Sequence, residues 1–318
     1  MTLLTLPLLA VAGVQLSAAA FTSGATGNPS NSLVANADWI APSASASVIG
    51  KAAGGITGAI AKSGTYYVYA NVSDTGNPAS GTSTLTADVT SLSNGGGTAT
   101  LSAGSYTAGG VAFGYRSSLL TAKSNVAAGT TAYTLTLADT GGNSATQSGF
   151  SVTVDNTVPA ASDVQTTNLT GGTAGKPELG DVVQLTYSEP IEPVSILAAW
   201  GGAATNVVVR ITDGGAGNDV LTVRNAANSG VLPLGSVSLG RTDYVTATRD
   251  FGATSTAAQM TRSGNAIAIT LGTASGVTAT AAATGTMSWT PAATATDIAG
   301  NASAITAKAE TGTVDLDF

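Results

Sequence analysis

One glycine-rich loop, Asp213-Gly-Gly-Ala-Gly-Asn-Asp219, carries oxygen ligands in a spacing that suits a hard cation. Calcium takes carboxylate and amide oxygens from flexible loops, so Asp213, Asn218 and Asp219 are candidate calcium ligands. The loop lacks the regular Asp/Asn alternation and the terminal Glu of an EF-hand, and the alternative is a metal-free hairpin loop. We expect no cofactor other than such structural calcium.

A second candidate cation site lies in the segment Asp155-Asn-Thr-Val-Pro159. Asp155 and Asn156, together with Asp297 or Asp139 from turns elsewhere in the chain, are a possible inter-domain oxygen site. The alternative is that these side chains only cap turns by hydrogen bonds to nearby backbone groups.

Glu189 and Glu192 are the closest pair among the four glutamates. Paired glycosidase carboxylates usually come from separate strands that flank the scissile bond, whereas these two belong to one Glu-Pro-Ile-Glu-Pro segment. The segment therefore predicts a solvent-facing turn and no catalytic dyad.

Three tryptophans could offer stacking platforms to a sugar. Trp289 lies in an alternating stretch typical of a strand, so it is expected to fill a sandwich core. Trp39 and Trp200, flanked by small residues and proline, remain candidate ligand contacts.

Composition excludes most catalytic and nucleic-acid-binding classes. The 318 residues include no His and no Cys, which removes the commonest general base, thiol nucleophiles and the usual zinc ligands. The net charge of −7 and the scattered basic residues argue against a nucleic-acid partner. A hydrophobic fraction of 43% argues against disorder. We therefore expect a folded protein that is not an enzyme.

The first twenty residues are expected to be a signal peptide. An uncharged apolar run from Leu3 to Leu16 precedes Ser17-Ala-Ala-Ala20, a small-residue segment suited to cleavage before Ala20 or Phe21. A basic leading region is missing, and a retained membrane anchor is the alternative. Cleavage would leave a mature protein with no membrane segment.

The remaining chain reads as strands and turns. Residues 21–64 predict a lead-in loop with one or two short strands. Period-two alternation broken by turns about every ten residues is typical of an all-β sandwich. One helical turn is possible between Pro193 and Trp200. The clearest expected strands are 66–72, 84–89, 132–137, 150–154, 181–187, 205–211, 220–223, 266–271 and 286–289.

A nearly repeated turn divides the chain in two. Asp139-Thr-Gly-Gly-Asn143 is followed much later by Asp297-Ile-Ala-Gly-Asn301, and each comes late in a Thr/Val/Ala-rich stretch. Such sequences suit tight turns between strands. We expect domain boundaries that place a first β-sandwich domain in residues 21–157 and a second in 158–318, with the joint at Asp155–Pro159.

These segments resemble a known class of bacterial proteins. Leu137–Asn143 with Val152–Pro159 is similar to the end of bacterial immunoglobulin-like repeats, and Gly180–Ile191 resembles the start of Ig-like domains in surface-layer and adhesive proteins. Ala18–Ser23 and Asp315-Leu-Asp-Phe318 resemble secreted actinobacterial proteins with camelysin-like signal regions. The resemblance implies two tandem Ig-like β-sandwiches in an exported protein.

The expected function is therefore structural: an extracellular or cell-surface stalk, spacer or adhesive unit. The alternatives are a filament subunit that assembles by strand addition and a carbohydrate-binding module. The corresponding partners are other surface proteins, glycans or further copies of the chain.

Overall fold

The protein builds two antiparallel β-sheets with separate cores. The computed structural model describes residues 38–318 except 77, 94–96 and 315. Residues 38–318 form one compact unit, so the expected signal peptide and the start of the lead-in lie outside the described residues. The described part holds no helix able to cross a bilayer. The expected all-β class is confirmed.

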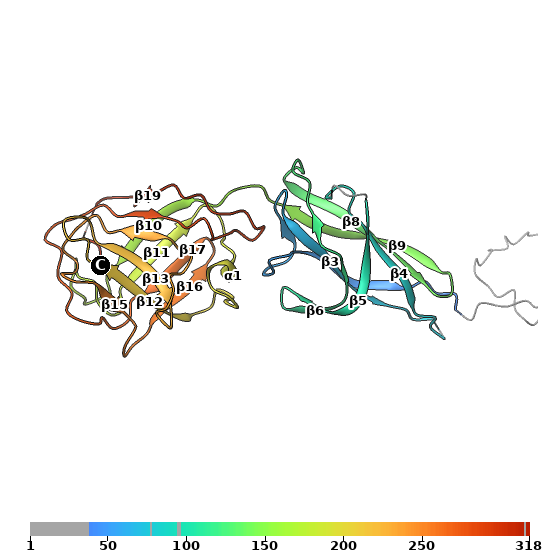
Figure 1. The fold of residues 1–318 in the computed structure, drawn as a ribbon, viewed down its shortest axis with the longest axis horizontal. Helices are drawn as coiled ribbons and strands as arrows, with labels where there is room; N and C mark the ends of the chain where they lie inside the picture. The colour runs from blue at the N-terminus through green and yellow to red at the C-terminus, as the bar shows by residue number, and fades with distance from the viewer. Residues whose placement is uncertain (1–37, 77, 94–96, 315) are drawn as a thin grey trace, which may run out of the picture. The chain divides into compact units, whose positions relative to one another are not determined.

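The first sheet runs from β1 to β9 (Figure 1). Its strand order is β1-β3-β6-β5-β4-β8-β9-β2, with β7 paired to β3. Strand β5 changes partner along its length, because its first residues pair with β4 and the rest pair with β6. The strands are β1 Ser43–Lys51, β2 Ala59–Ile60, β3 Thr65–Ser73, β4 Thr82–Asp88, β5 Thr98–Ala108, β6 Val111–Ser117, β7 Leu120–Thr121, β8 Gly129–Asp139 and β9 Ser144–Val154.

The second sheet runs from β10 to β19 and includes the short helix α1, Pro193–Ile196 (Figure 1). Its order is β10-β11-β17-β16-β12-β13-β14-β18-β19, with β15 paired to β12. The strands are β10 Ala161–Thr167, β11 Val182–Tyr187, β12 Thr205–Thr212, β13 Val220–Asn225, β14 Ser236–Ser238, β15 Arg249–Phe251, β16 Ala258–Ser263, β17 Ala266–Thr270, β18 Ser288–Thr290 and β19 Lys308–Ala309.

Period-two burial explains both cores. In β8 the side chains of Tyr133, Leu135 and Leu137 are buried while their neighbours face outward. In β11, Val183, Leu185 and Tyr187 do the same for the second core. Because successive side chains of a strand point to opposite faces, this alternation commits one face of each strand to a core. The expected strands are confirmed at all nine positions, with boundaries that differ by a few residues.

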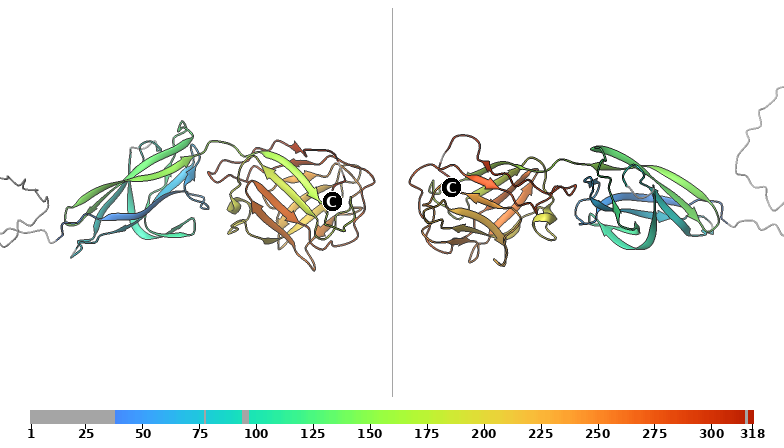
Figure 2. Two further views of the ribbon diagram at one scale, coloured as in Figure 1. Left: turned by 180° about the vertical axis from the view of Figure 1, so that it is seen from behind. Right: turned by 45° about the horizontal axis from the view of Figure 1, so that its top comes forward.

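Trp289 lies at the centre of the second core, as expected. Its side chain is fully buried, its Nε1 donates a hydrogen bond to the Leu234 carbonyl at 2.7 Å, and its ring meets Tyr187 edge-on. Phe318 is also buried and meets the Tyr244 ring edge-on. The C-terminus therefore lies against the second sheet in every view (Figures 1 and 2).

The expectation for residues 21–64 is wrong in one respect. Strand β1 is nine residues long and pairs along its length with β3, where only short strands were expected. Its Ser/Ala-rich sequence, SASASVIGK, has weak strand propensity, so it is the hydrogen-bonded pairing with the aromatic β3 that makes it a strand.

Candidate functional site

Two clusters of three carboxylates stand out among the described residues. The first consists of Asp38, Asp74 and Asp139, and the second of Asp155, Glu189 and Asp297. Within each cluster one oxygen from every side chain lies within 4.8 Å of the others. We name them the first and second acidic clusters.

The first acidic cluster is held by turns. The Asp139 carboxylate accepts hydrogen bonds from the backbone and side-chain amides of Asn143, at 2.8 and 2.7 Å. Asp38 accepts from Ile40 N and Ser80 N, and Asp74 from Gly76 N and Gly81 N. Hydrogen bonds from Ile40 and Ser80 lower the pKa of Asp38, so it is held as a carboxylate.

The second acidic cluster repeats this arrangement. The Asp297 carboxylate accepts from Gly300 N, Asn301 N and Asn301 Nδ2 at 2.6, 2.7 and 2.8 Å. Asp155 accepts from Thr157 N at 2.9 Å. The third member, Glu189, has an Oε1 atom that is buried and has no hydrogen-bond partner.

Glu189 is the electrostatically strained member of this cluster. Burial, followed by repulsion from Asp297 and Asp155, raises its pKa to about 7. Three carboxylates that repel one another and leave an oxygen unsatisfied form an oxygen-rich set of the kind that hard cations such as calcium bind. These residues could therefore hold a divalent ion.

The two clusters share one further contact. Asn143 Nδ2 donates to the carbonyl of Asp38 at 3.0 Å, and Asn301 Nδ2 donates to the carbonyl of Asp155 at 2.9 Å. Both acceptors begin the same pattern, Asp-x-x-x-Pro, at residues 38–42 and 155–159. Each Asp-x-x-Gly-Asn turn thus clips the segment that leads into its own sheet, and we call this arrangement the joint clip.

The sequence analysis had joined Asp155 with Asp297 or Asp139, and the structure brings together Asp155 and Asp297. It missed Asp38, Asp74 and Glu189 as cluster members. The repeated Asp-x-x-x-Pro pattern was a usable signal for Asp38, whereas Asp74 and Glu189 carry no local signature. Asn156 instead donates to the Val126 carbonyl and accepts from Lys62 N.

The Asp213–Asp219 loop is held by its own hydrogen bonds. Asp219 is fully buried, and its carboxylate accepts from the backbone amides of Gly214, Tyr244 and Val245. Asp213 caps Gly215 N, and Asn218 donates to Ser238. Asp219 is therefore already satisfied by backbone donors, and calcium at this loop stays a prediction.

The expectation that Glu192 faces solvent is wrong. Its side chain is only 2% exposed and lies 2.6 Å from Lys51 Nζ, which is 7% exposed. Lys51 ends β1 of the first sheet, and Glu192 directly precedes α1 of the second. The Glu-Pro-Ile-Glu-Pro segment is drawn inward because it finds a buried cation on the other half of the chain.

The tryptophan candidates differ in exposure. Trp39 is 76% exposed, directly after Asp38, so its ring is free to make contacts. Trp200 is 6% exposed and donates from Nε1 to the Ala203 carbonyl. Trp200 nevertheless lines a cavity of about 890 Å³, together with Lys51, Tyr67, Arg116 and Glu192.

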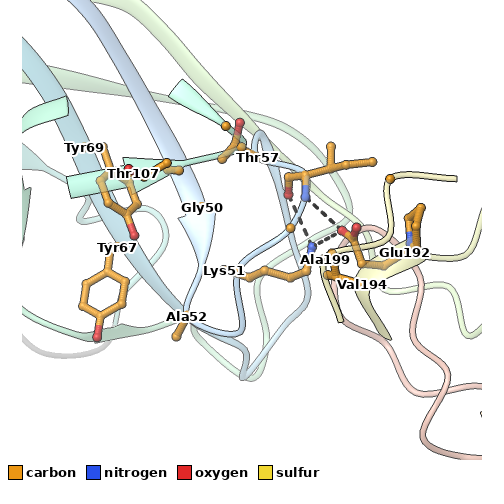
Figure 3. Close-up of a pocket in the computed structure, with 18 of the residues that line it drawn as sticks. Gly50, Lys51, Ala52, Thr57, Tyr67, Tyr69, Thr107, Glu192, Val194 and Ala199 are labelled. Carbon is orange, nitrogen blue, oxygen red and sulfur yellow. Dashed lines mark hydrogen bonds and ion pairs between the residues drawn. The ribbon is translucent and has the colours of Figure 1, made fainter. Parts of the chain in front are cut away.

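Figure 3 shows this cavity. Tyr67, Tyr69 and Thr107 lie at one end, and Lys51 with Glu192 lies at the other. The sequence analysis missed its tyrosines. The signal that was available is the run Tyr66-Tyr-Val-Tyr69, in which every second residue of a strand must face away from the core.

Comparisons with known proteins do not identify the chain. No protein-family model matches it, and no match was found among curated proteins or solved structures. Functional reasoning therefore depends on the geometry described above.

Proposed function

We propose that this protein is a non-enzymatic, exported cell-surface or extracellular protein in which two tandem Ig-like β-sandwich domains act as a spacer or adhesive stalk. Each sheet encloses its own core, which supports two structural units in series. The absence of His and Cys from the sequence leaves few routes to catalysis, and this supports a role carried by surface and shape.

The observation that carries the proposal is the repeated joint clip. At residues 155–159 the clip fastens the segment that connects the first sheet to the second. The same contact is present at Asp38, where the chain enters the first sheet. A protein that uses one device wherever the chain enters a β-sandwich is built as a series of end-to-end units, as a spacer requires.

Calcium at the acidic clusters would stiffen this series. A divalent ion bound by Asp155, Glu189 and Asp297 would tie the connecting segment to two turns of the second domain. It would also remove the repulsion that raises the pKa of Glu189. The cation is thus proposed as structural, with no part in a reaction.

The test measures the distance between the two domains with and without calcium. Because the chain has no cysteine, Leu119→Cys and Val277→Cys give two clean attachment sites for spin labels at positions that are 54% and 83% exposed. Pulsed dipolar spectroscopy should show a narrow distance distribution in calcium and a broader one in EDTA.

Matched variants locate the effect. Asp297→Asn should give the broad distribution even in calcium, whereas Asp139→Asn, the same change in the first acidic cluster, should leave it narrow. Asp213→Asn is a control outside both clusters. A distribution unaffected by calcium and by Asp297→Asn would overturn the cation-braced joint. Hydrolysis of polysaccharide or peptide that is lost in Glu189→Gln or Glu192→Gln would overturn the non-enzymatic assignment.

A further inference from the structure

The face of the first sheet that points away from its core carries an aromatic and cationic cluster. In β3, Tyr66 and Val68 are fully buried in the core, so Tyr67 and Tyr69 point to the opposite face. Strand β6 pairs beside β3 with Arg116 directly opposite Tyr69. The guanidinium of Arg116 is therefore delivered to the face that holds the two tyrosines.

Arg116 is enclosed between two aromatic rings. Its guanidinium carbon lies 4.3 Å from the centre of the Tyr67 ring and 4.4 Å from that of Tyr106. A register shift in β5 between Ala103 and Tyr106 brings the second ring into place. Gly104 is needed beneath it, since a Cβ there would lie 2.7 Å from the Tyr106 ring. The stack holds the planar guanidinium in a fixed orientation.

This oriented guanidinium has no anionic partner within the described residues. Its Nε is buried and makes no hydrogen bond. Arg210 of the second sheet shows the contrasting case, because its Nε and Nη2 donate to both carboxylate oxygens of Asp250 at 2.7 and 2.8 Å. Buried donors are nearly always satisfied, so the unused capacity of Arg116 points to an external acceptor.

The cavity around Arg116 defines the size and charge of that acceptor. Its volume of about 890 Å³ falls within the range of roughly 300–1,000 Å³ common for small-molecule sites. Lys51 and Arg116 are the two basic residues that line it in the described part of the chain, and Lys51 is already paired with Glu192. One cation remains free, which suits one carboxylate per ligand unit.

The rest of the lining offers hydroxyl and backbone groups. Thr57, Thr107, Tyr67 and Tyr69 line the cavity, and the turn at 109–110 consists of two glycines with positive φ, which leaves its backbone uncovered. Alcohol and amide groups of this kind exchange hydrogen bonds with sugar hydroxyls. An acidic peptide would place several carboxylates against a chain of net charge −7, with only one free cation to meet them.

We propose that this cavity binds a carboxylated saccharide of the uronic-acid type. Arg116 would donate two parallel hydrogen bonds to the carboxylate, the contact that guanidinium geometry favours. Thr57 and Thr107 would meet the ring hydroxyls. Tyr67 and Tyr106 position Arg116.

Isothermal titration of the whole protein with trimers of galacturonic, glucuronic and mannuronic acid tests the proposal. At least one trimer should bind, and its methyl ester should bind more weakly. Arg116→Gln should weaken binding by roughly 10- to 100-fold, the equivalent of a lost hydrogen bond to a charged group. Arg116→Lys keeps the charge without the planar fork and should be intermediate.

Controls separate recognition from folding. Arg210→Gln removes a paired arginine far in sequence from the site and should leave binding unchanged. Tyr67→Leu should weaken binding through the loss of the stack while the thermal melt remains cooperative. The proposal is overturned by any of three results: no binding of the trimers, equal binding of acid and methyl ester, or tighter binding of a tri-glutamate peptide. Full affinity in a folded Arg116→Gln variant also excludes it.

Discussion

Lys51 and Glu192, which are 141 residues apart in the sequence, form a buried ion pair with 2.6 Å between Nζ and Oε2. Lys51 also donates to the carbonyls of Ile56 and Ile298, and Glu192 accepts from Ile56 N. These contacts tie β1 of the first sheet to the segment before α1 of the second. Both charges are compensated, as buried charges must be if they are not to destabilise the fold.

The first prediction is that Glu192→Gln destabilises the protein strongly. The substitution leaves the buried Lys51 ammonium without its counter-ion, a change that costs about 3–5 kcal/mol when a buried pair is broken. Urea denaturation followed by circular dichroism measures the free energy of unfolding.

The pair Lys176–Glu178 is the matched control, because its side chains are 32% and 28% exposed. Glu178→Gln should cost less than about 1 kcal/mol, as expected for an exposed pair. Equal losses in the two variants would contradict the burial argument. The double variant Lys51→Met/Glu192→Leu should recover stability relative to Glu192→Gln, since it removes both charges.

The second prediction concerns two neighbouring glycines. Gly54 and Gly55 both have positive φ, at 81° and 86°, so alanine is strained at each. A Cβ at Gly55 would lie 2.6 Å from the Glu192 carboxyl carbon, while one at Gly54 would meet nothing within 4 Å. Gly55→Ala should therefore lower the melting temperature more than Gly54→Ala. Identical shifts would show that Glu192 moves aside freely.

The third prediction is a pH dependence of stability caused by Glu189. Its pKa is raised to about 7 in the folded protein from an ordinary value of 4.5. The folded state therefore binds this proton more tightly than the unfolded state does. The resulting stabilisation is fully present below pH 4.5 and is lost as the pH rises through 7.

Melting curves in EDTA between pH 5 and 8 test this, and Glu189→Gln should flatten the Glu189 contribution in that interval. Added calcium should raise the melting temperature more at pH 8 than at pH 5, because protons and a cation compete for the same carboxylate. A Glu189→Gln variant with the same slope as the parent would assign the dependence to other groups.

The fourth prediction is that Phe318 supports the second core. Its side chain is 1% exposed and packs 5.5 Å from the Tyr244 ring. Phe318→Ala removes a buried aromatic and should cost about 3–5 kcal/mol. Val314→Ala, at a position that is 44% exposed, should be nearly neutral. Differential scanning calorimetry compares the two, and similar melting temperatures would show that the core closes without this ring.

Local sequence was enough to predict strands where alternation was strong. Stretches such as 132–137 and 181–187 combine β-branched or aromatic residues with period two, and both are strands with one buried face. The two Asp-x-x-Gly-Asn turns were also predictable, because the Asp and Asn side chains bond within four residues of each other. Such interactions are local, so they can be inferred without knowledge of the fold.

Only the tertiary structure decided which distant groups meet. Nothing near Glu192 in the sequence announces Lys51, and nothing near Tyr67 announces that Tyr106 and Arg116 complete its stack. Strand β1 owes its form to pairing with β3, and the bulge in β5 sets where Tyr106 points. Sheet register joins residues far apart in the chain, and the energy of a buried charge or a stacked guanidinium depends on those partners.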